Sequence, residues 1–326
     1  MTPDFSLSAD ETDVTAAIRK NLVSLRLTDK TGMEADELDI AVVDSAGAIA
    51  LPRCGVVLTL SLGWRGEPLT PKGRFVVDEV SEDGPPDTIH ITARAADFRA
   101  TLKAQRDASY HNATLGSILT KIARRHSLTP AIGADLARTA VAHIDQTGES
   151  DANFLTRLGK DYDAIATVKC GRLVFVRAGT GKTASGAILP AATIARSEGD
   201  RHSFCATDRD GTVTGVMARW HDQTSGKTCY ALAGEEGVVK TLKRLYPTET
   251  AARAAADAAW AKIARAAHVF RVSLALGRPD ILAGALLTLA GWRTEIVSRA
   301  WIAGDVTHTL DANRGLTTDI EAEEKV

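Results

Sequence analysis

The segment that decides the fold reads IDQTGESDANFLTRLGKDYDAIATVKCGRLVFV over residues 144–176. Ser150 is a residue type that caps helix N-termini, and the negative charge of Asp151 suits the first turn of a helix. The apolar side chains that follow share one helical face: Phe154, Leu155, Leu158 and Tyr162. Gly171 allows a turn before the apolar run 173–176, which predicts a buried strand. The segment is therefore a capped amphipathic helix that leads into a β-hairpin.

The same segment carries a recognisable pattern of residues: Gln146, Glu149, Ser150, Phe154, Leu155, Arg157 and Leu158. This pattern resembles the core motif of the phage late control gene D family. These are the central tail-hub proteins of contractile phages, related to the hub of type VI secretion spikes. The resemblance extends to residues 73–80, 277–280 and 308–320, which are similar to the two barrels of the family. It implies structural roles for the seven motif residues and supplies no catalytic or cofactor-binding residue.

An N-terminal β region is predicted from a period of two in the apolar residues between positions 14 and 98. The alternating positions are Val23, Leu25 and Leu27, then Leu38, Ile40 and Val42, then Val56, Leu58, Leu60 and Leu62, then Phe75 and Val77, then Ile89 and Ile91. Turn sequences rich in Gly and Pro separate these runs. Many short strands with one apolar face indicate a first β-barrel domain over residues 1–100.

A small α/β insert is predicted over residues 101–178. Its first helix has Leu115, Ile118, Leu119 and Ile122 on one face. A short strand over 141–144 and the Ser150 helix follow. His126 and His143 are more readily a helix-end cation and a strand residue than metal ligands or bases, because no third partner is spaced near them.

Residues 179–204 are rich in Gly, Ala and Thr, which predicts a loop or linker. The sequence AGTGKT at 178–183 is similar to a phosphate-binding loop, but that pattern needs glycine where Val176 stands. Ser185, Gly186 and Pro190 also oppose the helix that such a loop must open. Nucleotide binding is therefore disfavoured, and Lys182 is expected to be dispensable.

A second β-barrel domain is predicted over residues 205–326, with an alanine-rich helix inserted near 248–268. Strands are expected at 269–276, 286–289, 295–301, 307–310 and 316–320. His308 lies near Asp305 and Asp311, but on a hairpin strand it more readily packs or faces solvent than binds metal. The fold class is thus α+β, mainly β, with two tube-like antiparallel barrels flanking the insert.

Composition narrows the possible functions. The 326 residues suggest two or three domains, and 39 Lys and Arg against 41 Asp and Glu give a net charge of -2. This balance of acidic and basic residues argues against a protein whose main role is to bind nucleic acid or an anionic membrane. The apolar run 281–292 is too short to cross a bilayer, and the N-terminus has no signal-peptide pattern. A soluble protein made in a cytoplasm is expected.

No catalytic site is predicted from the remaining candidate groups. The four cysteines, Cys54, Cys170, Cys205 and Cys229, are far apart, so neither a zinc site nor an intramolecular disulfide is expected. Asp78 and Glu79 are adjacent on a strand and should point to opposite faces, which prevents them from acting on one substrate atom. The sequence therefore predicts no enzyme, no cofactor and no metal.

The resemblance implies a homotrimeric hub that joins the six-fold tail tube to the three-fold central spike. Its implied partners are the tail tube protein and the central spike protein, with tape measure and baseplate wedge proteins as further candidates. The implied location is the tail baseplate of the virion, after assembly in the cytoplasm of a bacterial host. Two alternatives stay open: a tail-associated cell-wall hydrolase, and a nucleotide-binding assembly factor that rests only on the loop at 179–183.

Overall fold

The N-terminal β region begins earlier than the sequence pattern indicates. The computed structural model describes residues 1–44, 47, 49–96, 100–169, 171–189, 191–206, 213–222 and 224–325. The first elements are β1 (Pro3–Ala9), β2 (Thr12–Asp13), α1 (Thr15–Asn21), β3 (Leu22–Asp29), β4 (Glu37–Val43), β5 (Val57–Trp64), β6 (Thr70–Asp83) and β7 (Thr88–Ala95). Strand β1 was not predicted, although Phe5 and Leu7 are buried in it.

The predicted alternation places the core of this region correctly except at Val23 and at Val56, which is half-buried and precedes β5. Buried side chains on β3 to β7 include Leu25, Leu27, Leu38, Ile40, Val42, Leu58, Leu60, Leu62, Phe75, Val77, Ile89 and Ile91. Val23 belongs to the same alternating pattern but is 38% exposed. The pairing of β3 with β4 shifts register between Leu22 and Ser24, and this irregularity takes Val23 out of the core.

The insert is a helical layer between two small sheets. Its elements are η1 (Ala100–Lys103), β8 (Gln105–Thr114), α2 (Leu115–Arg125), β9 (Thr129–Ile132), α3 (Ala134–Ala137), β10 (Ala140–Ser150), α4 (Asp151–Tyr162), β11 (Ala164–Lys169) and β12 (Arg172–Arg177). Strands β8 and β10 form one sheet, and β11, β12 and β9 form the other. The apolar faces of α2 and α4 meet in one core. Thr114 caps α2, and Ser150 caps α4 at the predicted position.

The C-terminal part corrects two predictions. Its elements are β13 (Ala191–Ala195), η2 (Arg196–Glu198), β14 (Gly199–Ala206), β15 (Gly215–Asp222), β16 (Lys227–Gly234), β17 (Val239–Tyr246), α5 (Glu249–Ala266), β18 (His268–Leu274), β19 (Leu286–Ala290), α6 (Thr294–Val297), β20 (Trp301–Asp311) and β21 (Gly315–Glu324). Strand β13 and most of β14 lie inside the stretch predicted as a loop, where Ile194 is fully buried. The strand predicted at 295–301 is instead helix α6, and the carbonyl of Ile296 accepts a hydrogen bond from Trp301 Nε1 at 2.9 Å.

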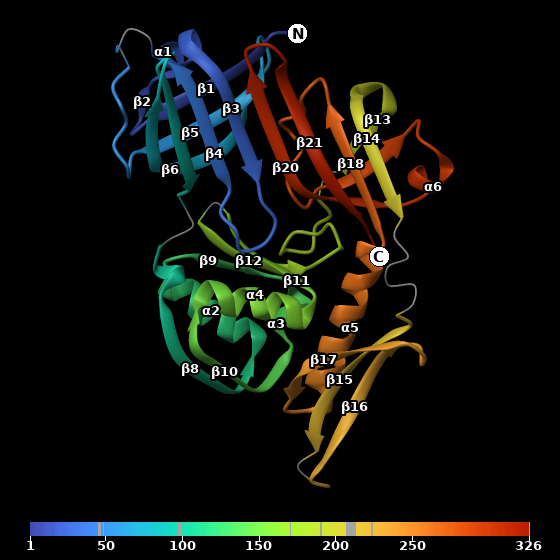
Figure 1. Cartoon of the computed structure of the whole chain (residues 1–326). Coiled ribbons are helices and arrows are strands. Elements are labelled where there is room, and N and C mark those ends of the chain that lie inside the picture. Colours follow the sequence, from blue (N-terminus) through green and yellow to red (C-terminus); the bar gives the residue numbers. More distant parts are fainter. Residues whose placement is uncertain are drawn as a thin grey trace.

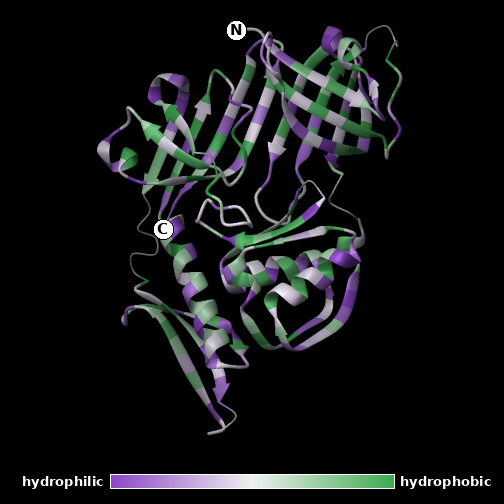
Figure 2. Cartoon of the chain, turned by 180° about the vertical axis from the view of Figure 1, so that it is seen from behind, coloured by the Kyte–Doolittle hydropathy of each residue, from purple (hydrophilic) through white to green (hydrophobic). Residues whose placement is uncertain are grey.

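One 13-stranded sheet, here called the platform, joins the two β regions. Its main strand order is β14-β18-β21-β20-β3-β4-β7-β6-β5-β1-β2, with β19 on β20 and β13 on β19. The junction is the antiparallel pairing of β3 with β20, from Asp29 opposite Val306 to Ser24 opposite Asp311. Polar and apolar residues alternate along its strands (Figure 2), as a sheet with one buried face requires. The mainly β prediction is confirmed, and the division into two barrels stays a prediction.

A separate unit, here called the α5 unit, consists of β15, β16, β17 and α5. Helix α5 covers one face of the three-stranded sheet with small side chains, among them Ala252, Ala255 and Ala256, which are buried against Val216 and Ala231. The unit therefore has a core of its own and is not part of the platform sheet. Figure 1 shows the insert and the α5 unit side by side on the same side of the platform. Within the described residues, no helix is both long and apolar enough to span a membrane.

Candidate functional site

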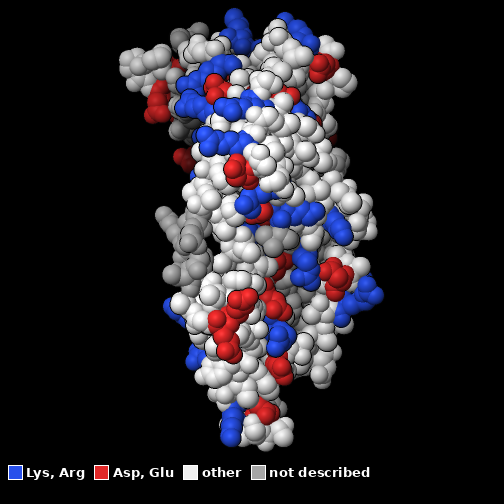
Figure 3. Space-filling view, turned by 90° about the vertical axis from the view of Figure 1, so that its right-hand side faces the viewer, with Lys and Arg blue, Asp and Glu red and all other residues white. Residues whose placement is uncertain are grey.

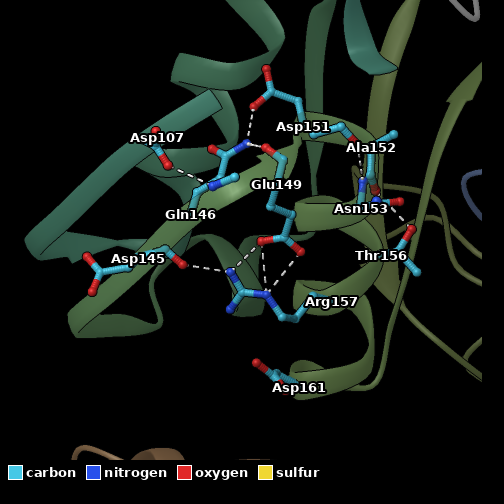
Figure 4. Close-up of polar contacts among 12 residues, drawn as sticks. Asp107, Asp145, Gln146, Glu149, Asp151, Ala152, Asn153, Thr156, Arg157 and Asp161 are labelled. Atoms are coloured by element: carbon cyan, nitrogen blue, oxygen red, sulfur yellow. Dashed lines mark hydrogen bonds and ion pairs between the residues drawn. The ribbon is translucent and has the colours of Figure 1, made fainter. Parts of the chain in front are cut away.

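The motif residues of the insert form a polar clamp where β10 ends and α4 begins. The Gln146 side chain is 1% exposed, and its Nε2 donates to the carbonyl of Glu149 and to Asp151 Oδ1, both at 2.9 Å. Arg157 Nη2 donates to Glu149 Oε2 at 2.7 Å and to the carbonyl of Asp145 at 2.7 Å. Figure 4 shows these side chains converging from the strand and the helix. The clamp fixes the direction in which the helix leaves the strand.

A bulge in β10 makes this clamp possible. The pairing of β10 with β8 shifts register between Gln146 and Glu149. Gly148 has a φ of 57°, in the left-handed region that glycine adopts without strain. Its amide donates to Asp107 Oδ1 at 2.7 Å, so the extra residue of the bulge is anchored to the neighbouring strand.

The helix that follows is buried on the predicted face. Ser150 Oγ accepts a hydrogen bond from the Asn153 amide at 3.2 Å, which is the predicted N-cap. Phe154, Leu155 and Leu158 are each 0% exposed. The Phe154 ring stacks on Tyr110 of β8 with centroids 5.8 Å apart, and the Arg157 guanidinium lies 4.8 Å from the Phe154 centroid. The motif thus joins the helix to the sheet by both apolar and polar contacts.

Asp151 is the centre of a buried ionic cluster that the sequence analysis did not identify. Its carboxylate is fully buried and accepts from Arg125 Nη1 at 2.8 and 2.9 Å, with His126 Nε2 at 2.7 Å and Arg106 Nε at 3.3 Å. Burial opposes ionisation, but hydrogen bonds from Gln146, His126 and Arg125 outweigh it and hold the pKa of Asp151 below its usual value. His126 lies at the C-terminal end of α2, as predicted, and is in addition a buried partner of Asp151.

A second polar cluster joins the insert to both halves of the platform. Lys169 of β11 contacts Asp29 at the end of β3, and its Nζ lies 2.7 and 2.9 Å from the two carboxylate oxygens of Asp36. Asp29 Oδ2 also accepts from the amide of Ala283 at 2.9 Å. Burial disfavours the Lys169 ammonium, but Asp29 and Asp36 together raise its pKa, so it stays protonated. One lysine of the insert therefore connects three parts of the chain.

The insert and the α5 unit are joined by two further ion pairs. Arg265 of α5 binds the Asp163 carboxylate with two nitrogens, one of them Nη1 at 2.8 Å from Oδ2. Arg244 Nη1 of β17 lies 2.5 Å from Asp161 Oδ2. A cavity of about 490 Å³ lies beside these contacts and is lined by residues of both parts, including Asp161 and Arg244. Its lining combines no nucleophile with a base that is hydrogen-bonded to it.

His308 lies in the interior of the platform. Its ring is 0% exposed, with Nε2 2.9 Å from Lys72 Nζ and Nδ1 2.9 Å from Thr318 Oγ1. The expectation of a packed strand residue is confirmed, and the expectation of a solvent-facing one is wrong. Burial and the nearby Lys72 lower the pKa of His308 to about 3, so the ring is neutral at neutral pH. Asp305, which lies near His308 in the sequence, accepts from Lys30 Nζ at 3.1 Å.

The glycine-rich segment at 178–183 does not have the architecture of a phosphate-binding loop. It continues into a short hairpin in which the Thr183 amide donates to the carbonyl of Ala187 at 2.8 Å, and Lys182 forms a β-bridge with Ile188. No helix follows the loop between residues 178 and 189. Lys182 is exposed to solvent. The amides that would bind phosphate at a helix N-terminus are therefore not gathered there.

The remaining candidate groups also lie apart from one another. Asp78 is exposed and pairs with Arg94 at 3.1 Å. Cys54 is an exposed free thiol and Cys229 a half-buried one, Cys205 is exposed, and Cys170 lies outside the described residues. In the part of the chain that the structure describes, no three His, Cys, Asp or Glu side chains gather as metal ligands would. The polar clusters described above instead hold the insert, the platform and the α5 unit together.

A comparison with family models and a comparison with known sequences agree with each other. The sequence model of the family described as "Phage tail baseplate hub (GPD)" matches residues 37–314. The chain is 39% identical to the probable baseplate hub protein of Escherichia phage P2, over 99% of this chain and 93% of that protein. It is 37% identical to the probable baseplate hub protein of Escherichia phage 186, over 100% of this chain and 94% of that protein.

Solved structures share the fold at low sequence identity. The tail protein from Neisseria meningitidis MC58 has a TM-score of 0.73 at 12% identity, covering 99% of this chain and 97% of that one. The 43 kDa tail protein of prophage MuSo2 from Shewanella oneidensis has a TM-score of 0.69 at 15% identity, covering 98% and 96%. An Escherichia coli component of the type VI secretion system has a TM-score of 0.60 at 13% identity, covering 94% and 74%.

Proposed function

The chain belongs to the phage tail baseplate hub family, and on this basis we propose that three copies form a ring joining the tail tube to the central spike. The observation that carries the proposal is the pairing of β3 with β20. This pairing makes one chain present two β regions side by side in a single platform. The proposal treats these two regions as pseudo-equivalent docking surfaces.

Symmetry then relates the platform to the tube. Three chains in a closed ring offer six β regions, which is the number that a six-fold tube requires. Cyclic closure is needed because an unclosed head-to-tail contact would grow a filament instead. The junction of Lys169 with Asp29 and Asp36 holds the insert against this platform, so each chain would act as one rigid part of the ring.

The side of the molecule that carries the insert and the α5 unit suits three-fold symmetry. The insert and the α5 unit lie together on one side of the platform, and each chain has one of each (Figure 1). Three copies would therefore give this end three-fold symmetry, which matches a trimeric spike. The tube protein and the spike protein are the proposed partners, with tape measure and baseplate wedge proteins as further candidates.

The distribution of charge on the surface favours protein partners over a polyanion. Lys and Arg gather at the platform end of the face in Figure 3, and acidic and basic residues alternate over the rest. With a net charge of only -2, mixed charges suit polar-rimmed protein interfaces better than electrostatic capture of a polyanion. We place the assembled protein in the tail baseplate of the virion and propose that assembly takes place in the cytoplasm of the host bacterium.

We also propose that the chain is not an enzyme. Support comes from ionisable groups in the interior and at the junction of the insert with the platform, because the side chains of Asp151, Lys169 and His308 are each hydrogen-bonded to neighbouring side chains. A peptidoglycan-release assay with purified protein tests this, using a known lytic enzyme as the positive standard. Release above the buffer blank that follows the protein through purification would instead establish a cell-wall hydrolase.

The ring is tested by a reconstruction of the tail tip from intact particles. We expect three copies of the chain, with the N-terminal and C-terminal β regions alternating around a central channel next to the tube. Six copies in a true six-fold ring would contradict the proposal. So would two β regions of one chain that do not superpose on each other.

A further inference from the structure

The exposed face of the β8–β10 sheet carries a pair of histidines that the proposed ring does not use. His111 and His143 lie directly opposite each other in the antiparallel register. Their Nδ1 atoms are 2.9 Å apart, whereas the ring centroids are 4.6 Å apart. The two rings therefore approach each other most closely at their Nδ1 atoms, and both residues are exposed to solvent.

A neighbouring carboxylate fixes the orientation of one ring. His143 Nε2 lies 2.9 Å from Asp145 Oδ2. Asp145 is exposed at the surface of the sheet, where a carboxylate is ionised at neutral pH and can only accept. His143 must then carry its proton on Nε2, which leaves the Nδ1 lone pair directed towards His111. A carboxylate that accepts from the far nitrogen is the arrangement that orients metal-binding histidines.

We propose that His111 and His143 bind one divalent transition-metal ion through their Nδ1 atoms, with Asp145 as a positioning residue and water as the remaining ligands. In the metal-free protein, His111 Nδ1–H donates to His143 Nδ1. When metal binds, this proton moves through solvent to Nε2 of His111, and the ring stays neutral. The binding step therefore needs a change of tautomer in His111 and a rotation of the two exposed rings that turns both Nδ1 lone pairs towards one metal position.

The spacing of the two nitrogens indicates which metal is favoured. With metal–nitrogen bonds of about 2.0–2.1 Å, two nitrogens at a right angle around the metal are about 2.9 Å apart. Tetrahedral geometry would separate them by about 3.4 Å at the same bond length. The 2.9 Å of the hydrogen bond in the metal-free protein is also the separation that a right angle at the metal requires, so the pair can take the geometry of Cu²⁺ and Ni²⁺ sites with nitrogen and oxygen ligands without moving the two nitrogens apart. Cu²⁺ should bind most tightly, because imidazole sites follow the order in which copper exceeds both nickel and zinc.

The location keeps the site accessible in the isolated chain. The β9–β11–β12 sheet lies on the platform side of the insert, and β8 and β10 lie beyond the helices (Figure 1). The pair is thus on the side of the insert away from the platform. The inference rests on these local contacts alone and does not depend on the ring.

The test uses full-length, tag-free protein titrated with CuCl₂ and followed by calorimetry and electron paramagnetic resonance. We expect one saturable equivalent per chain, with a spectrum that shows coupling to two imidazole nitrogens. His111→Gln and His143→Gln should each abolish the two-nitrogen signal. Asp145→Asn should weaken binding by about 10–100-fold, because it removes the carboxylate that orients His143.

His221→Gln is the matched control, since His221 is an exposed strand histidine at another site, on β15. It should leave binding unchanged, and circular dichroism should show that all four variants remain folded. The proposal is overturned if the wild-type protein binds no stoichiometric Cu²⁺. It is equally overturned if both His111→Gln and His143→Gln retain the wild-type spectrum.

Discussion

Lys169 of the insert lies with its ammonium 2.7 and 2.9 Å from the two carboxylate oxygens of Asp36, in the loop that joins β3 to β4. Asp36 is largely buried, and burial raises its pKa although Lys169 opposes this. Asp29, the other partner of Lys169, is also bonded to the amide of Ala283 from the C-terminal half. The loop between β3 and β4 is therefore the place where the insert and both halves of the platform meet.

Replacing Lys169 by Ala should destabilise the whole chain. The change would leave Asp29 and Asp36 near each other without the cation that compensates them. Because Lys169 is 30% exposed, we expect a loss of about 1–3 kcal/mol in the free energy of unfolding, measured by chemical denaturation. Lys160→Ala removes an exposed lysine from α4 and should change little. Equal effects of the two changes would show that the junction contributes no stability.

Replacing Phe154 by Ala should be more costly. The ring is 0% exposed and packs between Tyr110 and the Arg157 guanidinium, so its loss leaves a cavity in the core of the insert. A loss of about 3–5 kcal/mol is expected in the free energy of unfolding. Tyr230→Ala, at a site that is 60% exposed, should cost within about 0.5 kcal/mol. A neutral Phe154→Ala variant would show that α4 is not a core helix.

The sequence predicts local elements well where one physical signal dominates. The period of two in β4 and β5 identifies Leu38, Ile40 and Leu60 as core residues, and all three are fully or almost fully buried. The Ser150 cap and the apolar face of α4 follow from the same kind of local rule. Strand β1 was missed although Phe5 and Leu7 alternate, because these two are its only buried residues and two positions make a weak periodic signal.

Contacts between distant parts could not be predicted. A period of two shows which face of a strand is buried but not which strand lies beside it, so the pairing of β3 with β20 had no sequence signal. Asp151 was predicted only as an acidic residue in the first turn of a helix, where the helix dipole favours a negative charge. Its burial depends on Arg106, Arg125 and His126, which come from other elements. The contact of His308 with Lys72 could not be predicted for the same reason, since Lys72 lies 236 residues away.

Lys182 should be dispensable for stability and should bind no nucleotide. Its side chain is exposed and its loop forms a hairpin without a helix. Lys182→Ala is expected to change the free energy of unfolding by less than about 0.5 kcal/mol. Binding of a fluorescent ATP analogue should be equally weak in both proteins. A saturable signal that Lys182→Ala abolishes would favour the nucleotide-binding alternative.

Stability should fall in acid partly because of His308. Its pKa is about 3 in the folded chain and 6.5 for the unperturbed side chain, so between these values the unfolded state binds more protons. Stability therefore rises with pH across this window and is lost as pH falls from 6.5 towards 3. Burial is the main cause, and the ammonium of Lys72, 2.9 Å away, adds to it. A single such group contributes a slope of up to about 1.4 kcal/mol per pH unit.

The contribution of His308 can be isolated by comparison with His308→Gln, which has no titrating ring. Acidic side chains elsewhere titrate in both proteins, so the difference between their two stability curves reports the histidine. We expect the variant to be destabilised at pH 7 because Lys72 and Thr318 lose the imidazole as a partner. The gap should narrow as pH falls from 6.5, since only the wild-type protein loses the His308 contribution. Urea denaturation at several pH values measures both curves, and parallel curves between pH 4 and pH 6.5 would mean that the ring takes up a proton as readily in the folded chain as in the unfolded one.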